Sequence, residues 1–209
     1  MRSTRSLGIS LMVALFILTA LLTSPVAAGT LVIDNFEDGN FSARPEWWVF
    51  GQIEPEVIND ALSVSGQTQA EWYVGGLGCY IAQDNQDLSQ YEDLQLDIYG
   101  YGPKSGTLKV ELFDDDNGNW KVEQDEAKDY APVYDDRFVA EINVDWQGWQ
   151  QVVIPLEDFV DSNPKVGDGI WNPDQASSSG GLLQVQFICL ASEKVGSVHY
   201  IIDDIKFAK

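Results

Sequence analysis

Short runs in which apolar and polar residues alternate dominate this sequence, and they constrain its fold more than any other feature. Leu94, Leu96 and Ile98 alternate with polar or aromatic neighbours, and the runs at 108–113 and 184–189 have the same pattern. A period of two is expected of strands that bury one face. Further short runs of this kind occur at 31–36, 70–74, 138–144, 149–154 and 198–207.

Turn signals separate these runs, and helical periodicity is not sustained anywhere in the sequence. The turns include Gly100-Tyr101-Gly102-Pro103 and Ser179-Gly180-Gly181. Residues 155–159 are expected to form a single helical turn. Many short strands joined by glycine-rich turns predict an all-β fold, an antiparallel β-sandwich of the jelly-roll type.

Residues 1–28 have the pattern of a secretory signal peptide. Two arginines precede the apolar run at 11–18, and small residues lead up to the expected cleavage point after Ala28. We therefore expect a single domain at 29–209, without a membrane span after cleavage. The predicted location is outside the cell or in the periplasm or cell envelope, and we expect a monomer.

The chain carries a net charge of −21, and loss of the two arginines in the signal peptide would take it to −23. Phosphate backbones and anionic lipid surfaces repel such a chain, so nucleic acids are excluded as partners. A saline habitat, solubility and cation binding all remain explanations for the acidity. Only specific acidic clusters would argue for a cation.

Three segments in order, Leu31–Gly39, Trp149–Phe159 and Tyr200–Phe207, resemble parts of the galactose-binding-like jelly-roll domains. These domains include the family 11 carbohydrate-binding modules and the complex I intermediate-associated protein 30 domains. The resemblance implies a β-sandwich whose first and last strands are neighbours, with a structural calcium near that seam. It also implies a non-catalytic domain that binds carbohydrate.

Acids from both ends of the chain are the predicted ligands of this calcium, because Ca²⁺ takes six to eight oxygen ligands. Alternation places Asp203 on the inward face with Ile205, where a carboxylate needs a cation or hydrogen-bond donors. A solvated acidic terminus is the alternative. The predicted ligands are Asp34, Glu37, Asp38 and Asp203.

A second acidic cluster, at 114–119, is interpreted as a turn rather than as a metal site. Asn117-Gly118 between two strand-like runs is typical of a tight hairpin. A calcium loop would have a bidentate glutamate at its twelfth position, and Asp125 occupies that position here.

The outward faces of the predicted strands carry side chains that suit a sugar. Carboxylates and amides pair with hydroxyl groups, and aromatic rings stack on the apolar face of a pyranose. In family 11 modules the ligand lies along a concave sheet face, so the resemblance implies a polysaccharide or glycan on this face. An ordinary solvated sheet face would carry similar residues. The predicted ligand-binding residues are Tyr73, Asp97, Tyr99, Glu111, Gln184 and Gln186, together with Trp47 and Trp171 in predicted loops.

Two other functions are compatible with the sequence. A jelly-roll glycosidase needs two carboxylates, for which Glu71 and Glu111 are candidates. A protein-interaction or envelope structural domain of the same fold is the other alternative, and an exposed apolar patch would favour it.

The single histidine and the two cysteines indicate no further site. His199 lacks the partners of a zinc site or a nucleophilic triad, so we assign it a structural role. Cys79 and Cys189 are either disulfide partners, if their strands are neighbours, or two buried thiols.

Overall fold

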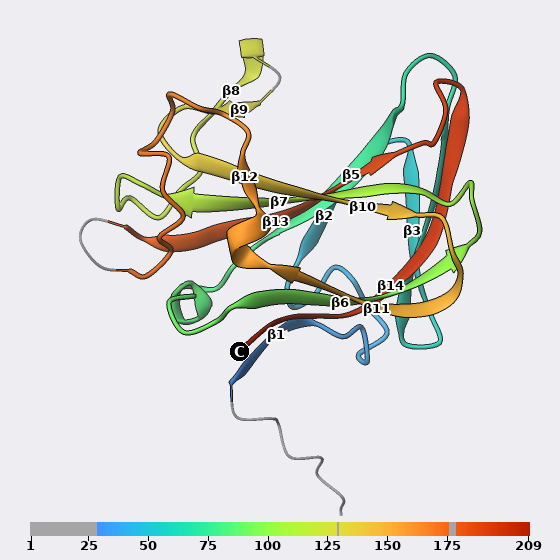
Figure 1. Cartoon of the computed structure of the whole chain (residues 1–209), viewed down its shortest axis with the longest axis horizontal. Helices are drawn as coiled ribbons and strands as arrows, with labels where there is room; N and C mark the ends of the chain where they lie inside the picture. The colour runs from blue at the N-terminus through green and yellow to red at the C-terminus, as the bar shows by residue number, and fades with distance from the viewer. Residues whose placement is uncertain (1–28, 129, 176–178) are drawn as a thin grey trace, which may run out of the picture.

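The computed structural model describes residues 29–128, 130–175 and 179–209, which form two antiparallel sheets packed face to face (Figure 1). This confirms the predicted β-sandwich. The first sheet contains β1 (Thr30–Asp34), β3 (Ile53–Ile58), β4 (Ala61–Thr68), β6 (Asp93–Tyr101), β11 (Gln147–Pro155) and β14 (Gly196–Ala208). The second contains β2 (Trp47–Gly51), β5 (Tyr73–Tyr80), β7 (Gly106–Asp115), β10 (Asp136–Val144), β12 (Val160–Asp161) and β13 (Gly181–Leu190).

Strands far apart in the sequence are neighbours in both sheets. The strand order is β11-β6-β14-β4-β3 in the first sheet, with β1 also paired to β14, and β12-β10-β7-β13-β5-β2 in the second. A small separate pair is formed by β8 (Gln124–Asp125) and β9 (Ala131–Pro132). The remaining elements are the short 3-10 helices η1 (Gln83–Asn85), η2 (Glu126–Lys128) and η3 (Leu156–Asp158). Within the described ranges, no helix is long and apolar enough to cross a membrane.

The alternating runs form the core as predicted, because every second residue of each strand points between the sheets. Removing such aliphatic side chains from water contributes about 1.5–3 kcal/mol each. The fully buried residues include Leu94, Leu96 and Ile98 of β6 and Leu108, Val110 and Leu112 of β7.

The first and last strands are neighbours, as the resemblance implied. β1 and β14 pair with Thr30 opposite Ala208, and the C-terminus lies beside β1 in Figure 1.

A β-bulge in β14 makes the predicted inward placement of Asp203 wrong. The buried positions are even-numbered from Val198 to Ile202, whereas the next two, Ile205 and Phe207, are odd-numbered. The register with β6 shifts between these positions, where Asp204 has a positive φ of 50°. One extra residue moves the following side chains to the other face. Asp203 therefore lies on the outward face, opposite Asp97.

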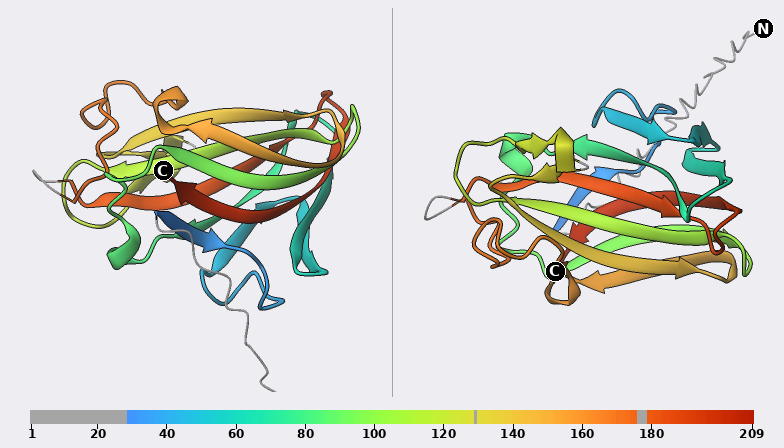
Figure 2. Two further views of the ribbon diagram at one scale, coloured as in Figure 1. Left: turned by 60° about the horizontal axis from the view of Figure 1, so that its bottom comes forward. Right: turned by 90° about the horizontal axis from the view of Figure 1, so that it is seen from above.

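The hairpin predicted at Asn117-Gly118 is also wrong. β7 ends at Asp115, and its neighbours are β10 and β13 rather than the segment that follows the turn. The chain between β7 and β10 makes a long excursion that includes β8 and β9 and lies at one end of the sandwich (Figure 1, Figure 2).

Both cysteines are buried free thiols. They lie on the neighbouring strands β5 and β13, but the residue opposite Cys79 is Val185 rather than Cys189. Of the two alternatives for the cysteines, the disulfide is therefore wrong. Burial raises the pKa of both thiols, so they remain protonated and pack as small apolar groups.

Candidate functional site

One row of outward-facing positions crosses the second sheet and combines aromatic, amide and acidic groups. The strand registers place Trp48 opposite Gly78, Gly78 opposite Gln186, and Gln186 opposite Glu111. Side chains on either side of this row extend the same surface. We call it the polar-aromatic face, and it comprises Trp48, Phe50, Tyr73, Tyr80, Lys109, Glu111, Arg137, Gln184 and Gln186.

Glycines in β5 allow two aromatic rings of β2 to lie over the backbone. A Cβ atom at Gly78 would be 2.6 Å from Cζ2 of Trp48, and one at Gly76 would collide with the ring of Phe50. The indole also packs on Tyr80, with ring centroids 4.7 Å apart and planes at 42°. Trp48 and Phe50 are half-buried. Rings held in this way are stacking platforms for the apolar face of a sugar.

A buried carboxylate with two cationic neighbours lies beside these rings. Glu111 points away from the core, yet its side chain is only 3% exposed. The ammonium of Lys109 is 2.7 Å from one carboxylate oxygen, and Nη1 of Arg137 is 3.9 Å from the other. Burying a carboxylate requires this kind of compensation. Together these side chains present charged hydrogen-bonding groups at fixed positions.

The amide groups and a phenol add donors and acceptors to the same surface. The Nε2 of Gln184 donates a hydrogen bond to Oε1 of Gln186 at 2.6 Å. Burial, together with the nearby Cys189 and Glu111, raises the pKa of the Tyr73 hydroxyl. The phenol therefore stays protonated and is able both to donate and to accept hydrogen bonds.

The predicted ligand-binding residues are divided between opposite sides of the sandwich. Tyr73, Glu111, Gln184 and Gln186 lie on the polar-aromatic face, whereas Asp97 and Tyr99 lie on the outward face of the first sheet. The expectation of one shared face is therefore wrong, because alternation separates inward from outward positions but does not assign a strand to a sheet.

Five residues of the polar-aromatic face were not among the predicted ligand residues: Trp48, Phe50, Tyr80, Lys109 and Arg137. Of these, Tyr80 and Arg137 lie in no run from which a ligand residue was predicted. One signal was available, because glycines at alternate positions of a strand, such as Gly76 and Gly78, indicate the close approach of another group.

The two predicted loop tryptophans have different environments. Trp47 lies in β2, where it is 2% exposed and stacks on Phe187 with centroids 5.5 Å apart. The prediction that it is an exposed platform is wrong, because alternation turns Trp47 inward and Trp48 outward. Trp171 does lie in a loop, but it is half-buried and packs edge-on against Phe138.

The outward face of the first sheet carries a second aromatic group. Tyr99 contacts Trp149 and Tyr101 edge-to-face, with centroids 5.6 Å and 4.9 Å away, and His199 stacks on Tyr101 at 3.9 Å. The Trp149 and Tyr101 side chains are 52% and 47% exposed. Both faces carry exposed rings, since Tyr80 on the polar-aromatic face is 65% exposed, but only the polar-aromatic face combines them with rings lying over glycines beside a buried ion pair.

Comparison with known proteins assigns a family to this arrangement. The family model described as "Carbohydrate binding domain 30" matches residues 56–209. The chain belongs to this family. Membership confirms the resemblance to carbohydrate-binding modules and makes the protein a carbohydrate-binding domain.

Solved structures with the same fold include other carbohydrate-binding modules. A family 11 module from Clostridium thermocellum, in complex with a β-1,3-1,4-mixed-linked tetrasaccharide, has a TM-score of 0.56 at 17% identity and covers 87% of this chain and 96% of that chain. The agarase AgWH50C has a TM-score of 0.54 at 12% identity, covering 87% of this chain and 24% of that chain. At these identities the structures show the fold alone. The search of curated proteins found no match.

The geometry of this family 30 domain also bears on the glycosidase alternative. Glu71 is exposed in the segment before β5, whereas Glu111 is committed to Lys109 and Arg137. A catalytic pair needs one protonated acid and one ionised carboxylate facing a common bond. Glu111 is thus held in an ion pair with Lys109 and Arg137, an arrangement that suits a binding surface.

The structure does not bring the four predicted calcium ligands together at one point. Asp34 is 7% exposed, and its two oxygens accept hydrogen bonds from the Phe36 N–H at 2.9 Å and the Trp47 indole at 2.8 Å. Asp203 faces outward, whereas Glu37 and Asp38 are exposed. Within the described residues, the acids that approach closely enough to share a cation are Asp116, Asp136 and Asp168.

Proposed function

We propose that this carbohydrate-binding domain binds a neutral polysaccharide along the polar-aromatic face and does not cleave it. The row from Trp48 across Gly78 and Gln186 to Glu111 is the observation that supports this proposal. An indole held over a glycine offers a stacking surface, and the amide and the ion-paired carboxylate offer partners for hydroxyl groups.

Charge favours a neutral glycan. The chain has a net charge of −21, and the two cations on this face, Lys109 and Arg137, already compensate Glu111. An acidic polysaccharide would be repelled. A β-linked glucan has flat pyranose faces for the rings and hydroxyl groups around each ring's edge. Mixed-linked β-1,3-1,4-glucan, whose tetrasaccharide is bound to the family 11 module, is therefore the first ligand to test.

Two tryptophan variants decide which face binds. Trp48→Ala removes the platform on the polar-aromatic face, and Trp149→Ala removes an exposed indole from the opposite face as a matched control. Affinity electrophoresis in gels containing mixed-linked β-glucan should show binding about 10- to 100-fold weaker for Trp48→Ala and unchanged for Trp149→Ala. The reverse result would place the site on the first sheet, with Asp97 and Tyr99.

A wider screen tests the function itself. Folded wild-type protein should bind at least one neutral polysaccharide selectively. If a broad panel gave no binding, the alternative of a protein-interaction or envelope domain would replace this proposal.

We also propose secretion, on the basis of residues 1–28, which lie outside the described part of the chain. Mass spectrometry of the exported protein should find a mature N-terminus within one or two residues of Gly29. An intact N-terminus in the exported protein would contradict cleavage.

A further inference from the structure

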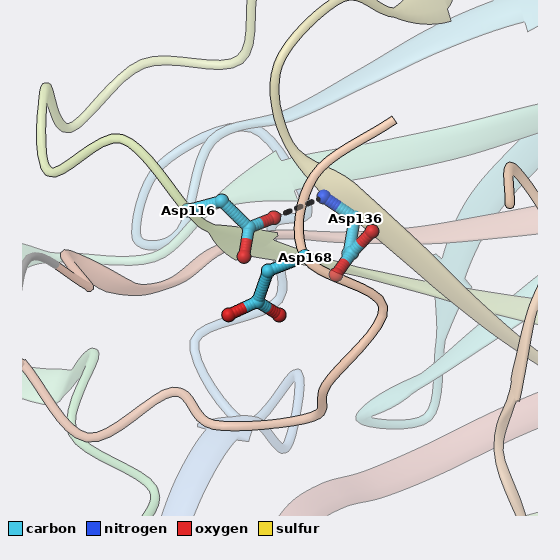
Figure 3. Close-up of side chains that lie close together, drawn as sticks. All are labelled: Asp116, Asp136 and Asp168. Atoms are coloured by element: carbon cyan, nitrogen blue, oxygen red, sulfur yellow. Dashed lines mark hydrogen bonds between the residues drawn. The ribbon is translucent and has the colours of Figure 1, made fainter. Parts of the chain in front are cut away.

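Three aspartates from separate segments converge at one end of the second sheet (Figure 3). Asp116 follows β7, Asp136 begins β10, and Asp168 lies in the segment between β12 and β13. One carboxylate oxygen from each lies within 4.8 Å of the other two. Asp136 and the buried Phe138 are two residues apart in β10, so both point between the sheets. The cluster therefore lies at the end of the sandwich interior, apart from the polar-aromatic face.

A buried oxygen without a hydrogen-bond partner points into this cluster. Asp136 is 0% exposed, and its Oδ2 accepts a hydrogen bond from the N–H of Gly169 at 2.6 Å. Among the described residues no group donates to its Oδ1. A methyl group at Gly167 would collide with both this oxygen and Oδ2 of Asp116, so the two oxygens face the same space. An orphaned buried oxygen needs a partner that donates or carries positive charge.

Protein cations do not supply that charge. None of the three carboxylates forms an ion pair in the described ranges, and the nearby Arg137 side chain interacts with Glu111 and Ser162 instead. Asp136 is fully buried, and one oxygen from each of the three carboxylates lies within 4.8 Å of the other two. The negative charge of the cluster is therefore costly unless a cation is bound there.

The donor set selects the kind of cation. All three side chains are carboxylates, with neither histidine nor cysteine among them, which favours a hard cation over zinc. Magnesium requires near-ideal octahedral geometry, whereas calcium accepts irregular sets of six to eight oxygens that include water. Asp168 is exposed, so water has access to complete such a set.

We propose that Asp116, Asp136 and Asp168 bind one calcium ion that joins the end of β7 and the start of β10 to the segment before β13. That segment also carries Trp171, which packs on Phe138 of β10. The bound ion stabilises this end of the sandwich. This proposal does not depend on glycan binding.

Isothermal titration of the EDTA-stripped protein with calcium chloride, and separately with magnesium chloride, tests the site. We expect one calcium per chain, weaker magnesium binding, and a higher melting temperature with calcium. Asp136→Asn should weaken calcium binding at least about tenfold, because it removes charge without changing shape. Asp168→Asn should weaken calcium binding in the same way. Because Asp168 is exposed, this variant should fold normally and keeps the test valid even if Asp136→Asn misfolds.

Asp203→Asn is the matched control, because it changes an acid of the seam that the sequence predicted as a ligand. Its calcium binding should equal that of the wild type. The proposal would be overturned if the folded protein took up no calcium, if magnesium bound equally well, or if both cluster variants bound calcium like the wild type. It would equally be overturned if the seam variant lost binding.

Discussion

Replacing Gly78 by alanine tests whether the indole of Trp48 is held over the β5 backbone. The added Cβ would lie 2.6 Å from Cζ2 and 2.9 Å from Cε2 of the Trp48 ring. Carbon atoms in ordinary contact are about 3.5–4.0 Å apart, so the ring has to move by about 1 Å. The three atoms nearest to this Cβ all belong to the indole, so a ring movement relieves the collision without displacing a strand.

The expected cost to stability is small. Overpacking costs about 1–3 kcal/mol, and the reduced freedom of the unfolded chain offsets about 0.4–1 kcal/mol of it. The free energy of unfolding should therefore fall by about 0–2.6 kcal/mol, which lowers the melting temperature by about 0–10 °C. A displaced platform loses the specific part of ring stacking, about 0.5–1.5 kcal/mol, which weakens glycan binding about 2- to 10-fold.

Fluorine NMR of protein labelled with 5-fluorotryptophan detects the ring movement even without a ligand. The chain has seven tryptophans, and Trp48→Phe assigns the resonance of interest. Gly78→Ala should shift that resonance, and calorimetry with mixed-linked β-glucan should show the weaker binding. An unshifted resonance would refute the argument that the ring is held over the strand.

Gly76→Ala is the contrasting variant. Its added methyl group would collide with the Phe187 carbonyl oxygen as well as with the Phe50 ring. A backbone atom in the middle of a sheet cannot move aside as a ring does, so this variant should lose more stability than Gly78→Ala. Equal melting temperatures for the two variants would contradict this distinction.

Two further substitutions test how buried acids are stabilised. Asp34→Asn leaves one side-chain acceptor oxygen for two donors, the Trp47 indole and the Phe36 N–H. The free energy of unfolding in urea should therefore fall by about 1–3 kcal/mol. Unchanged stability would show that these hydrogen bonds contribute nothing. Glu111→Gln leaves Lys109 without its counter-charge and should lower the free energy of unfolding by about 1–3 kcal/mol in the same assay. Lys104→Gln, which breaks the exposed pair with Glu193, should leave the melting temperature unchanged, and equal effects of these two variants would refute the role of burial.

The period of two in the sequence was sufficient to predict the fold class and much of the core. Leu94, Leu96 and Ile98 are inward as expected because each lies in an uninterrupted strand. The same rule failed at Asp203, where one extra residue in a bulge reversed the faces. A bulge leaves the composition of a strand unchanged, so alternation alone does not reveal it.

The candidate site was less predictable, because it depends on which strands are neighbours. β5 contains Gly75, Gly76 and Gly78, which obscure alternation and resemble a turn, so most of this strand was missed. β2 follows a proline and was interpreted as a loop. Only the pairing of these two strands reveals that the glycines accommodate the rings of Trp48 and Phe50.

The acidic cluster shows why a local motif search fails here. A calcium loop takes its ligands from one continuous stretch, and by that criterion the segment 114–119 was rejected. In the fold, β7 ends in Asp114 and Asp115 where its antiparallel neighbour β10 begins with Asp136, and Asp114 lies directly opposite Asp136. The side chains of Asp114, Asp115 and Asp136 are fully buried, and burial raises the pKa of Asp114 to about 8. Like charges directly opposite on paired strands repel each other. Acidic runs at facing strand ends therefore require protons or a cation, and this signal becomes visible in the sequence only once the strand pairing is known.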